Sequence, residues 1–179
     1  MRWIKWALPA GVVLILSCEV PTGEFENPLD IEAAEEEGIL PPALVFFPDS
    51  ISVNTGNSVS IRVFAMEVDS MTGAHIQLTY DNANLSLTSV KPGDFLEGSG
   101  PPLFFYEDDP ASGILDIHTI YLGTDSASVS GTGSLANLVF GTTAQGESTL
   151  QYTQVCELVD QDGDVIEILG FGKGVIVAR

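Results

Sequence analysis

The sequence predicts an all-β protein built as an antiparallel β-sandwich, and two observations lead to this fold class. From residue 43 onward, short runs rich in β-branched and aromatic residues follow one another, and no run keeps the period of an amphipathic helix. Clusters of Gly, Pro, Asn and Asp separate the runs, so that the connections are too short to hold crossover helices. Strands joined in this way pair antiparallel and pack as two sheets. The predicted strands span residues 43–47, 51–53, 58–65, 74–80, 85–90, 103–106, 114–122, 135–142, 149–159 and 165–177.

Residues 1–17 are predicted to be a secretory signal peptide. Two basic residues lie among the first five, and the apolar run over residues 6–16 is too short to span a bilayer. The end of this segment, Ile15 to Cys18, resembles the lipobox of bacterial lipoproteins, although Leu16 is bulkier than the usual occupant of its position. The resemblance implies that Cys18 carries a lipid and that the protein is exported and anchored in the bacterial cell envelope, at the outer membrane or cell surface. The alternative is an ordinary signal peptide, or an apolar anchor, with an incidental Cys18.

Residues 18–42 are predicted to form an acidic, proline-containing tether. The stretch 19–42 holds eight carboxylates, four prolines and no basic residue, so it lacks the apolar surface needed to fold alone. A flexible chain of this length spans about 25 Å on average, which is enough to hold a domain clear of a membrane surface. Residues 31–37 could form two helical turns, and residues 35–37 could alternatively be a recognition motif. The folded domain is predicted over residues 43–179.

The net charge of the chain excludes some classes of binding partner. The sequence has 25 acidic and 6 basic residues and a formal charge of -19. This excess repels nucleic acid and anionic lipid headgroups, so we expect no nucleic-acid partner and membrane contact only through the lipid on Cys18. We expect a monomer whose partner is neutral, cationic or metal-bridged. If Cys18 carries lipid, Cys156 has no disulfide partner, and the apolar alternation around it predicts a buried, unreactive thiol.

Four segments resemble the strands of cohesin domains, in the same order. The longest runs from Thr72 to Gly93 and matches a strand, a Tyr-Asp turn, a Leu-rich strand and a Val-x-x-Gly exit; the others lie at residues 56–63, 133–140 and 174–177. The resemblance covers residues 43–178 and implies a nine-stranded jelly-roll sandwich that binds a protein. Cohesins dock the calcium-loaded dockerin modules of polysaccharide-degrading enzymes, so a dockerin-like partner is implied. The resemblance implies no cofactor for this chain, and calcium only through the partner.

The resemblance also implies a contact face. In the best-known cohesins, an Asn and an Asp on the exposed side of the strand before the Tyr-Asp turn contact the dockerin, and here those places hold Gly73 and His75. This departure changes both the hydrogen bonding and the charge at the centre of an interface. Cohesin topology places the strand at residues 114–122 beside it, with alternate side chains pointing outward. The predicted partner-binding residues are Gly73, His75, Gln77, Thr79, Tyr106, Asp116, His118 and Ile120.

The two histidines of the chain form a separate hypothesis. Under the implied topology His75 and His118 lie near each other, beside Asp116. Such a trio could bind a divalent metal or make partner binding sensitive to pH, because imidazole titrates near neutrality. The alternative is two exposed histidines with no common role.

Carbohydrate binding, as part of polysaccharide catabolism, is the alternative to protein recognition. Sugar platforms use exposed aromatic rings, and Phe104 with Tyr106 could form a small one, while alternation places Phe105 in the core. The acidic run 160–164 predicts a hairpin turn, since it lacks the end residues of an EF-hand loop; the run 107–109 predicts a solvated loop tip, with a calcium site as its alternative. No nucleophile has a base motif beside it, so we predict no catalytic residue and no enzyme.

Overall fold

The computed structural model describes residues 27, 29–97, 100–122 and 128–179. The predicted signal peptide and Cys18 therefore lie outside the described residues. The described chain contains one helix and twelve strands: α1 (Ile31–Glu36), β1 (Ala43–Phe47), β2 (Ser50–Val53), β3 (Ser58–Tyr80), β4 (Leu85–Pro92), β5 (Leu103–Asp109), β6 (Ile114–Ile120), β7 (Val129–Thr142), β8 (Gly146–Tyr152), β9 (Glu157–Asp160), β10 (Val165–Ile166), β11 (Gly170–Phe171) and β12 (Lys173–Ala178). The predicted all-β sandwich is confirmed.

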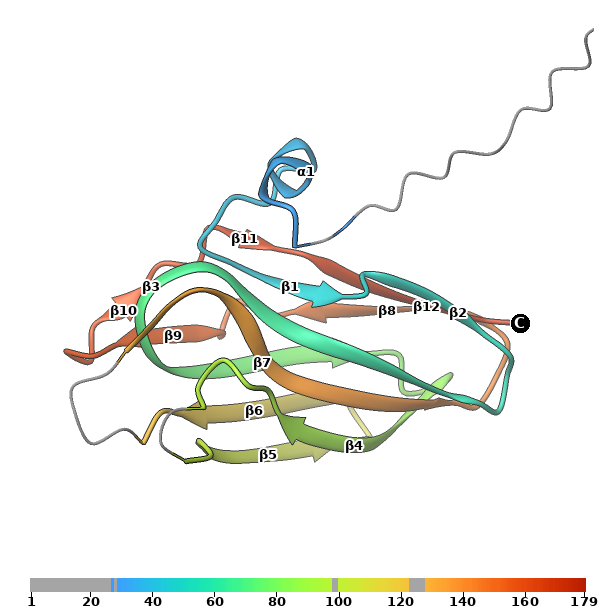
Figure 1. Cartoon of the computed structure of the whole chain (residues 1–179). Helices are drawn as coiled ribbons and strands as arrows, with labels where there is room; N and C mark the ends of the chain where they lie inside the picture. The colour runs from blue at the N-terminus through green and yellow to red at the C-terminus, as the bar shows by residue number, and fades with distance from the viewer. Residues whose placement is uncertain (1–26, 28, 98–99, 123–127) are drawn as a thin grey trace, which may run out of the picture.

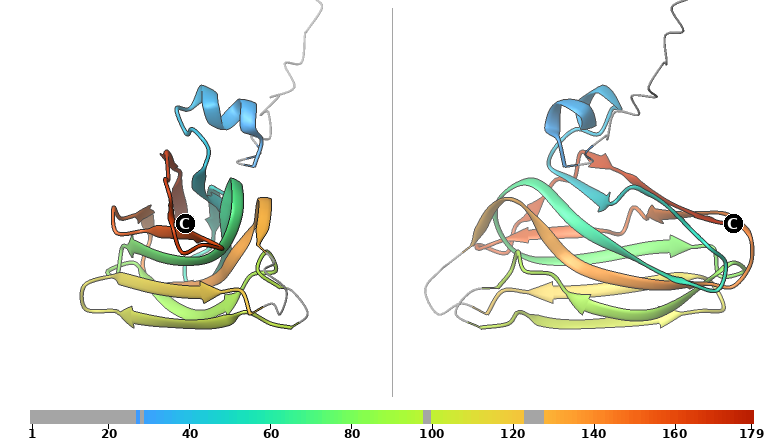
Figure 2. Two further views of the ribbon diagram at one scale, coloured as in Figure 1. Left: turned by 90° about the vertical axis from the view of Figure 1, so that its left-hand side faces the viewer. Right: turned by 45° about the vertical axis from the view of Figure 1, so that its right-hand side comes forward.

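The strands form two layers that share the long strand β3 (Figures 1 and 2). The first half of β3 pairs antiparallel with β1 and β7, and β7 pairs in turn with β4. The second half of β3 pairs with β6, β8 and β9, and β6 pairs in turn with β5. Among the described strands β5 pairs with β6 alone, so it forms an edge of its layer.

β3 passes from one layer to the other through a bend near Glu67 and Ser70. These residues have φ values of 49° and 53°, and the register with β7 shifts on both sides of Val68. The hydroxyl oxygens of Thr132 and Ser130 accept hydrogen bonds from the N–H groups of Glu67, at 3.1 Å, and Ser70, at 2.9 Å. Bulges of this kind let a strand bend while it stays paired. Residues 58–65 and 74–80, predicted as two strands, therefore belong to one.

The strand count and two of the pairings differ from the prediction of nine antiparallel strands. The run 149–159 divides into β8 and β9 at a turn in which Cys156 N donates to Thr153 O at 3.4 Å. The run 165–177 divides into β10, β11 and β12, because Leu169 N donates to Pro42 O at 2.8 Å and leads the chain from β9 toward β1. β1 with β11, and β2 with β12, are parallel pairs.

The hydrophobic core lies between the two layers. Alternating side chains of both layers fill it, and Phe46, Ile76 and Phe140 are among the largest that are fully buried. The ring of Phe46 stacks on Tyr152 with 4.4 Å between centroids, and the Tyr152 hydroxyl donates a hydrogen bond to Val45 O at 2.9 Å. Because close-packed interiors resist deformation, this core fixes the outward side chains of β3 and β6 in place.

The helix α1 packs on the layer that contains β1, on the opposite side of the molecule from β5 and β6 (Figure 1). The Asp30 carboxylate caps the helix by accepting from Glu32 N at 3.0 Å and Ala33 N at 3.4 Å. Ala34 is buried in a small cluster with residues of β1 and β3, and Leu29 and Ile39 pack against this cluster. These apolar side chains place residues 29–39 in contact with the domain, within the segment predicted as a tether. In the part of the chain that the structure describes, no helix has the length and apolar character needed to cross a membrane.

Candidate partner-binding face

Four strands of one layer bring a set of outward side chains together. In β6, buried side chains alternate with Asp116, His118 and Ile120, which therefore point outward. The cross-strand register places His75 opposite His118 and Gln77 opposite Asp116. We name the outward residues the histidine face; they are Leu103, Phe105 and Glu107 of β5, Asp116, His118 and Ile120 of β6, His75, Gln77 and Thr79 of β3, and Glu157 and Val159 of β9. The predicted proximity of the two histidines and Asp116 is confirmed.

Three parallel rings form the centre of the histidine face. The rings of His75 and His118 are stacked with centroids 4.3 Å apart and an interplanar angle of 2°. The ring of Phe105 stacks on the other side of His118, at 4.5 Å and 13°. β5, β6 and β3 each contribute one ring, so the stack crosses three neighbouring strands. The stack holds the three rings in one orientation on the sheet.

A hydrogen-bond chain fixes the histidine at one end of this stack. His75 Nε2 lies 2.8 Å from Asp116 Oδ1, and it carries the hydrogen because an ionised carboxylate can only accept. Gln77 Nε2 donates to the same oxygen at 3.0 Å, and Thr153 Oγ1 donates to Gln77 Oε1 at 2.9 Å. Each donor and acceptor of the chain thus restricts the rotamer of its neighbour. Fixed side chains lose less conformational entropy when a partner binds.

The surroundings of His118 favour its neutral form. Partial burial lowers the pKa of His118, and the positive charge that His75 carries when protonated lowers it further. The Asp116 carboxylate opposes both effects, because it favours the imidazolium form. The net effect is a pKa below the ordinary value for histidine.

Gly73 lies on β3 in line with this face but is buried. A Cβ atom at this position would lie 3.1 Å from Val159 Cγ2 and 3.7 Å from Ile120 Cγ1. These two side chains cover the position that the resemblance assigns to a contact residue. Ile120, by contrast, is 41% exposed, and Val159 is half-buried beside it. The accessible surface at this end of the face is therefore aliphatic.

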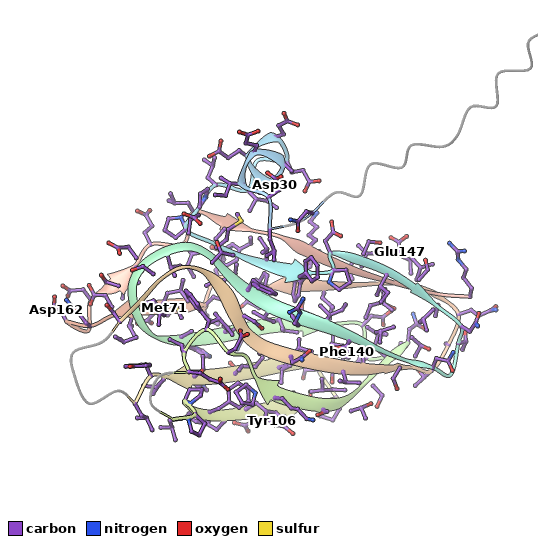
Figure 3. All side chains as sticks on the ribbon, viewed as in Figure 1. Asp30, Met71, Tyr106, Phe140, Glu147 and Asp162 are labelled. Atoms are coloured by element: carbon purple, nitrogen blue, oxygen red, sulfur yellow. The ribbon has the colours of Figure 1, made fainter. Side chains whose placement is uncertain are left out.

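The β5 aromatics differ from the sequence prediction. Phe105, expected in the core, is 52% exposed, whereas Phe104, expected outside, packs against the core. The reason is the pairing of Phe105 with the outward His118, which the run Leu103 to Tyr106 does not reveal because all four of its side chains are apolar or aromatic. Tyr106 pairs with the inward Ile117, yet it is 47% exposed because β5 is an edge strand (Figure 3).

The predicted sugar platform requires that Phe104 and Tyr106 are both exposed. Phe104 and Tyr106 share a side of β5, but Phe104 is packed against the core, so the two rings do not form an exposed pair.

The sequence prediction did not include Phe105 and Leu103 among the contact residues. Continuing the β6 alternation across the short turn at residues 110–113 would have placed Phe105 beside His118 and found both residues.

The remaining predictions concern the acidic runs 160–164 and 107–109 and the possible metal site at the two histidines. Asp160 Oδ1 accepts from the N–H groups of Asp162 and Asp164, each at 2.9 Å, as expected of a hairpin turn. The run 107–109, predicted as a loop tip, is instead the end of strand β5. There the hydrogen bond from the Ser112 side chain lowers the pKa of Asp109, and the Tyr80 hydroxyl donates to Asp108 Oδ1 at 2.9 Å. Within the described ranges no group of three or more His, Cys, Asp or Glu side chains is arranged so that it could hold a metal ion. The parallel rings of the two histidines do not direct their nitrogen lone pairs toward a common point.

Aromatic residues are enriched at protein–protein interfaces relative to the rest of a protein surface, so the exposed aromatic stack on one sheet favours protein binding. The cohesin domain model matches residues 45–170, and the chain therefore belongs to the cohesin family. Its fold is that of a non-catalytic protein-binding module. No curated protein sequence matches the chain significantly.

Solved cohesin structures share the fold. The non-cellulosomal cohesin of the hyperthermophilic archaeon Archaeoglobus fulgidus matches with a TM-score of 0.63 and 21% identity, over 76% of this chain and 90% of that one. The sixth cohesin of scaffoldin B from Acetivibrio cellulolyticus, solved with a Cel5 dockerin mutant, matches with a TM-score of 0.66 and 19% identity, over 76% and 98%. A Clostridium thermocellum cohesin, from a Coh-OlpC-Doc435 complex, matches with a TM-score of 0.65 and 13% identity, over 76% of this chain and 92% of that one.

Proposed function

We propose that the protein is a docking module of the bacterial cell envelope that binds a protein partner through the histidine face, and that a dockerin module is this partner. The observation that carries the proposal is the ordered stack of Phe105, His118 and His75 among exposed aliphatic side chains. A few residues near the centre of an interface supply most of its binding energy, and aromatic residues are enriched at interfaces. The dockerins present in solved complexes of similar cohesins support the choice of partner.

Gly73 and His75 occupy the places that hold an Asn and an Asp in the best-known cohesins, so this face recognises a partner by different contacts. Gly73 is covered, so it offers no side-chain hydrogen bond to a partner. The place next to it holds an imidazole already bonded to Asp116. Apolar and aromatic contacts therefore replace the carboxamide and carboxylate contacts of the best-known cohesins. Dockerins that present apolar side chains at the matching place are the expected binders.

Calorimetry with isolated dockerin modules tests the proposal. The full chain with Cys18→Ala is titrated with a panel of calcium-loaded dockerins, and then with the same dockerins after chelation. Binding that requires calcium is expected, and Phe105→Ala should weaken it at least about tenfold, equivalent to about 1.4 kcal/mol. Ser86→Ala, on the exposed surface of β4 in the other layer, is the matched control and should leave the affinity unchanged. Failure of every dockerin, or equal losses in the two variants, would contradict the proposal.

The membrane anchor is tested separately. We propose that the signal segment exports the chain and that Cys18 carries the lipid. In the source organism, the protein should incorporate labelled fatty acid and sediment with membranes. Cys18→Ala should abolish both properties, whereas Cys156→Ala should leave them unchanged. Labelling that persists in Cys18→Ala would assign the anchor to another residue.

A further inference from the structure

We propose that the partner of the histidine face presents apolar side chains surrounded by lysine and arginine. This inference rests on the proposed function and specifies the chemistry of the partner surface. It combines two features of the same face. The centre is exposed, apolar and aromatic, and the border carries carboxylates but, among its described residues, no lysine or arginine.

The centre of the face is apolar and accessible. Leu103, Phe105 and Ile120 are 47%, 52% and 41% exposed, and Leu103 lies directly opposite Ile120 in the register of β5 and β6. Phe105 also stacks on the His118 ring, so exposed aliphatic and aromatic side chains lie side by side on two neighbouring strands. Surface of this kind gains free energy when a partner removes it from water.

Carboxylates border this centre on both sides. On the β5 side, Glu107 is exposed opposite Asp116, and Asp109 is exposed opposite Ile114 at the end of the same strand. On the β9 side, Glu157 is exposed opposite His75. These three carboxylates, like Asp116, belong to the outward row of their strands. A partner that covers the centre therefore comes close to negative charge on either side.

The cations that the structure describes lie on other elements. Arg62 belongs to the first half of β3, where its guanidinium lies 4.9 Å from the ring centroid of Phe47 and 5.1 Å from that of Phe64. The others are Lys91 on β4, Lys173 on β12, and Arg179 after β12. The described part of the histidine face thus carries no lysine or arginine that could neutralise Glu107, Asp109 or Glu157 or attract acidic groups of a partner.

Charge complementarity follows from this distribution. An acidic partner would bring like charges together at the border, which costs free energy and slows association. Lysine and arginine would pair with Glu107, Glu157 and Asp116 instead. Arginine suits the site in a second way, because its planar guanidinium stacks on aromatic rings, and β5 leaves the Phe105 side of the stack at a sheet edge.

The test uses two synthetic amphipathic peptides with identical apolar residues. One carries lysine and arginine at its polar positions, and the other carries glutamate. The probe is added to the full Cys18→Ala chain, and backbone amide shifts are recorded at 50 mM and 500 mM NaCl. The basic peptide should shift Phe105, His118 and Ile120, with an affinity at least about tenfold higher at low salt because exposed charges are screened at high salt. The acidic peptide should cause no shift on this face.

A matched pair of variants separates local charge from net charge. Glu157→Gln removes a carboxylate at the border, and Glu147→Gln removes one on β8, which lies away from β5 (Figure 3). Glu157→Gln should weaken the basic peptide about three- to tenfold, and Glu147→Gln should weaken it less than about twofold. Equal effects of the two variants, equal binding of the two peptides, or no binding of the basic peptide to this face would overturn the inference.

The dockerin panel keeps this inference separate from the proposed function. If dockerins bind but prefer acidic contact surfaces and show no dependence on salt, the partner chemistry is wrong and the docking function stands. If no dockerin binds while the basic peptide shifts the histidine face, the partner chemistry stands and the dockerin assignment fails.

Discussion

The imidazole rings of His75 and His118 lie parallel, with an angle of 2° between their planes and 4.3 Å between their centroids. They come from two strands whose register places the residues directly opposite each other. Two rings at this separation cannot both become charged without mutual repulsion. The stack therefore favours at least one neutral imidazole, and its stability depends on pH.

Acid should destabilise the fold through His118. Partial burial, and then His75, lower the pKa of His118 below its value of 6.5 in the unfolded chain. Between these two pKa values the unfolded chain binds the extra proton, so the free energy of unfolding falls as the pH drops through this window and then levels off. His118→Phe keeps a ring in the stack but removes the titration. Urea unfolding is measured from pH 7.5 to pH 5. As the pH falls, the free energy of unfolding of the wild type should decrease relative to that of the variant. A difference that stays constant over this range would contradict the assignment.

Tyr152→Phe should destabilise the sandwich by about 0.5–1.5 kcal/mol, the net contribution of a typical hydrogen bond within a protein. The hydroxyl of Tyr152 donates to Val45 O at 2.9 Å within the core, and the ring, which the variant retains, stacks on Phe46. Tyr106→Phe is the control, because Tyr106 is 47% exposed, and its stability should change by less than about 0.5 kcal/mol. Urea denaturation of both variants measures the difference. Equal stabilities of the two variants would contradict a stabilising role for the Tyr152 hydrogen bond.

Gly93→Ala should destabilise the fold by about 1–3 kcal/mol, as overpacking does. A Cβ atom at this position would overlap the carbonyl group of Ser134, and the backbone cannot move freely because Gly93 N donates to Leu135 O at 2.9 Å. Gly100→Ala is the matched control, since nothing lies within 4 Å of the corresponding Cβ. Thermal melting of the two variants compares them, and similar melting temperatures would refute the packing argument.

Cys156 should react slowly with alkylating agents in the folded protein. Burial raises the pKa of the Cys156 thiol, and its hydrogen bonds with the backbone of Gln77 only partly offset this effect. Because the thiolate is the reactive form, the pH midpoint of alkylation in a Cys18→Ala chain should be higher in buffer than in urea. Identical midpoints in the two solvents would show that the thiol is not perturbed by the fold.

Much of the fold and part of the site are determined by local sequence pattern. Alternation of Leu115, Ile117 and Thr119 with Asp116 and His118 fixes which side chains of β6 face the core, because successive residues of a strand point to opposite sides. The same rule applies to His75 and Gln77 on β3. The turn residues between the runs determine where most strands end. These are properties of single strands, so the sequence alone predicts them.

The tertiary structure alone decided which strands meet, in which register, and what covers each position. Alternation did not reveal the side of β5 on which Phe105 lies, because its neighbours are apolar too, and pairing with His118 resolved it. Gly73 is covered because Val159, distant in sequence, pairs with it on β9. The bend that makes β3 one strand depends on hydroxyl groups of β7. Each of these features is a contact between segments far apart in the chain, which no local pattern encodes.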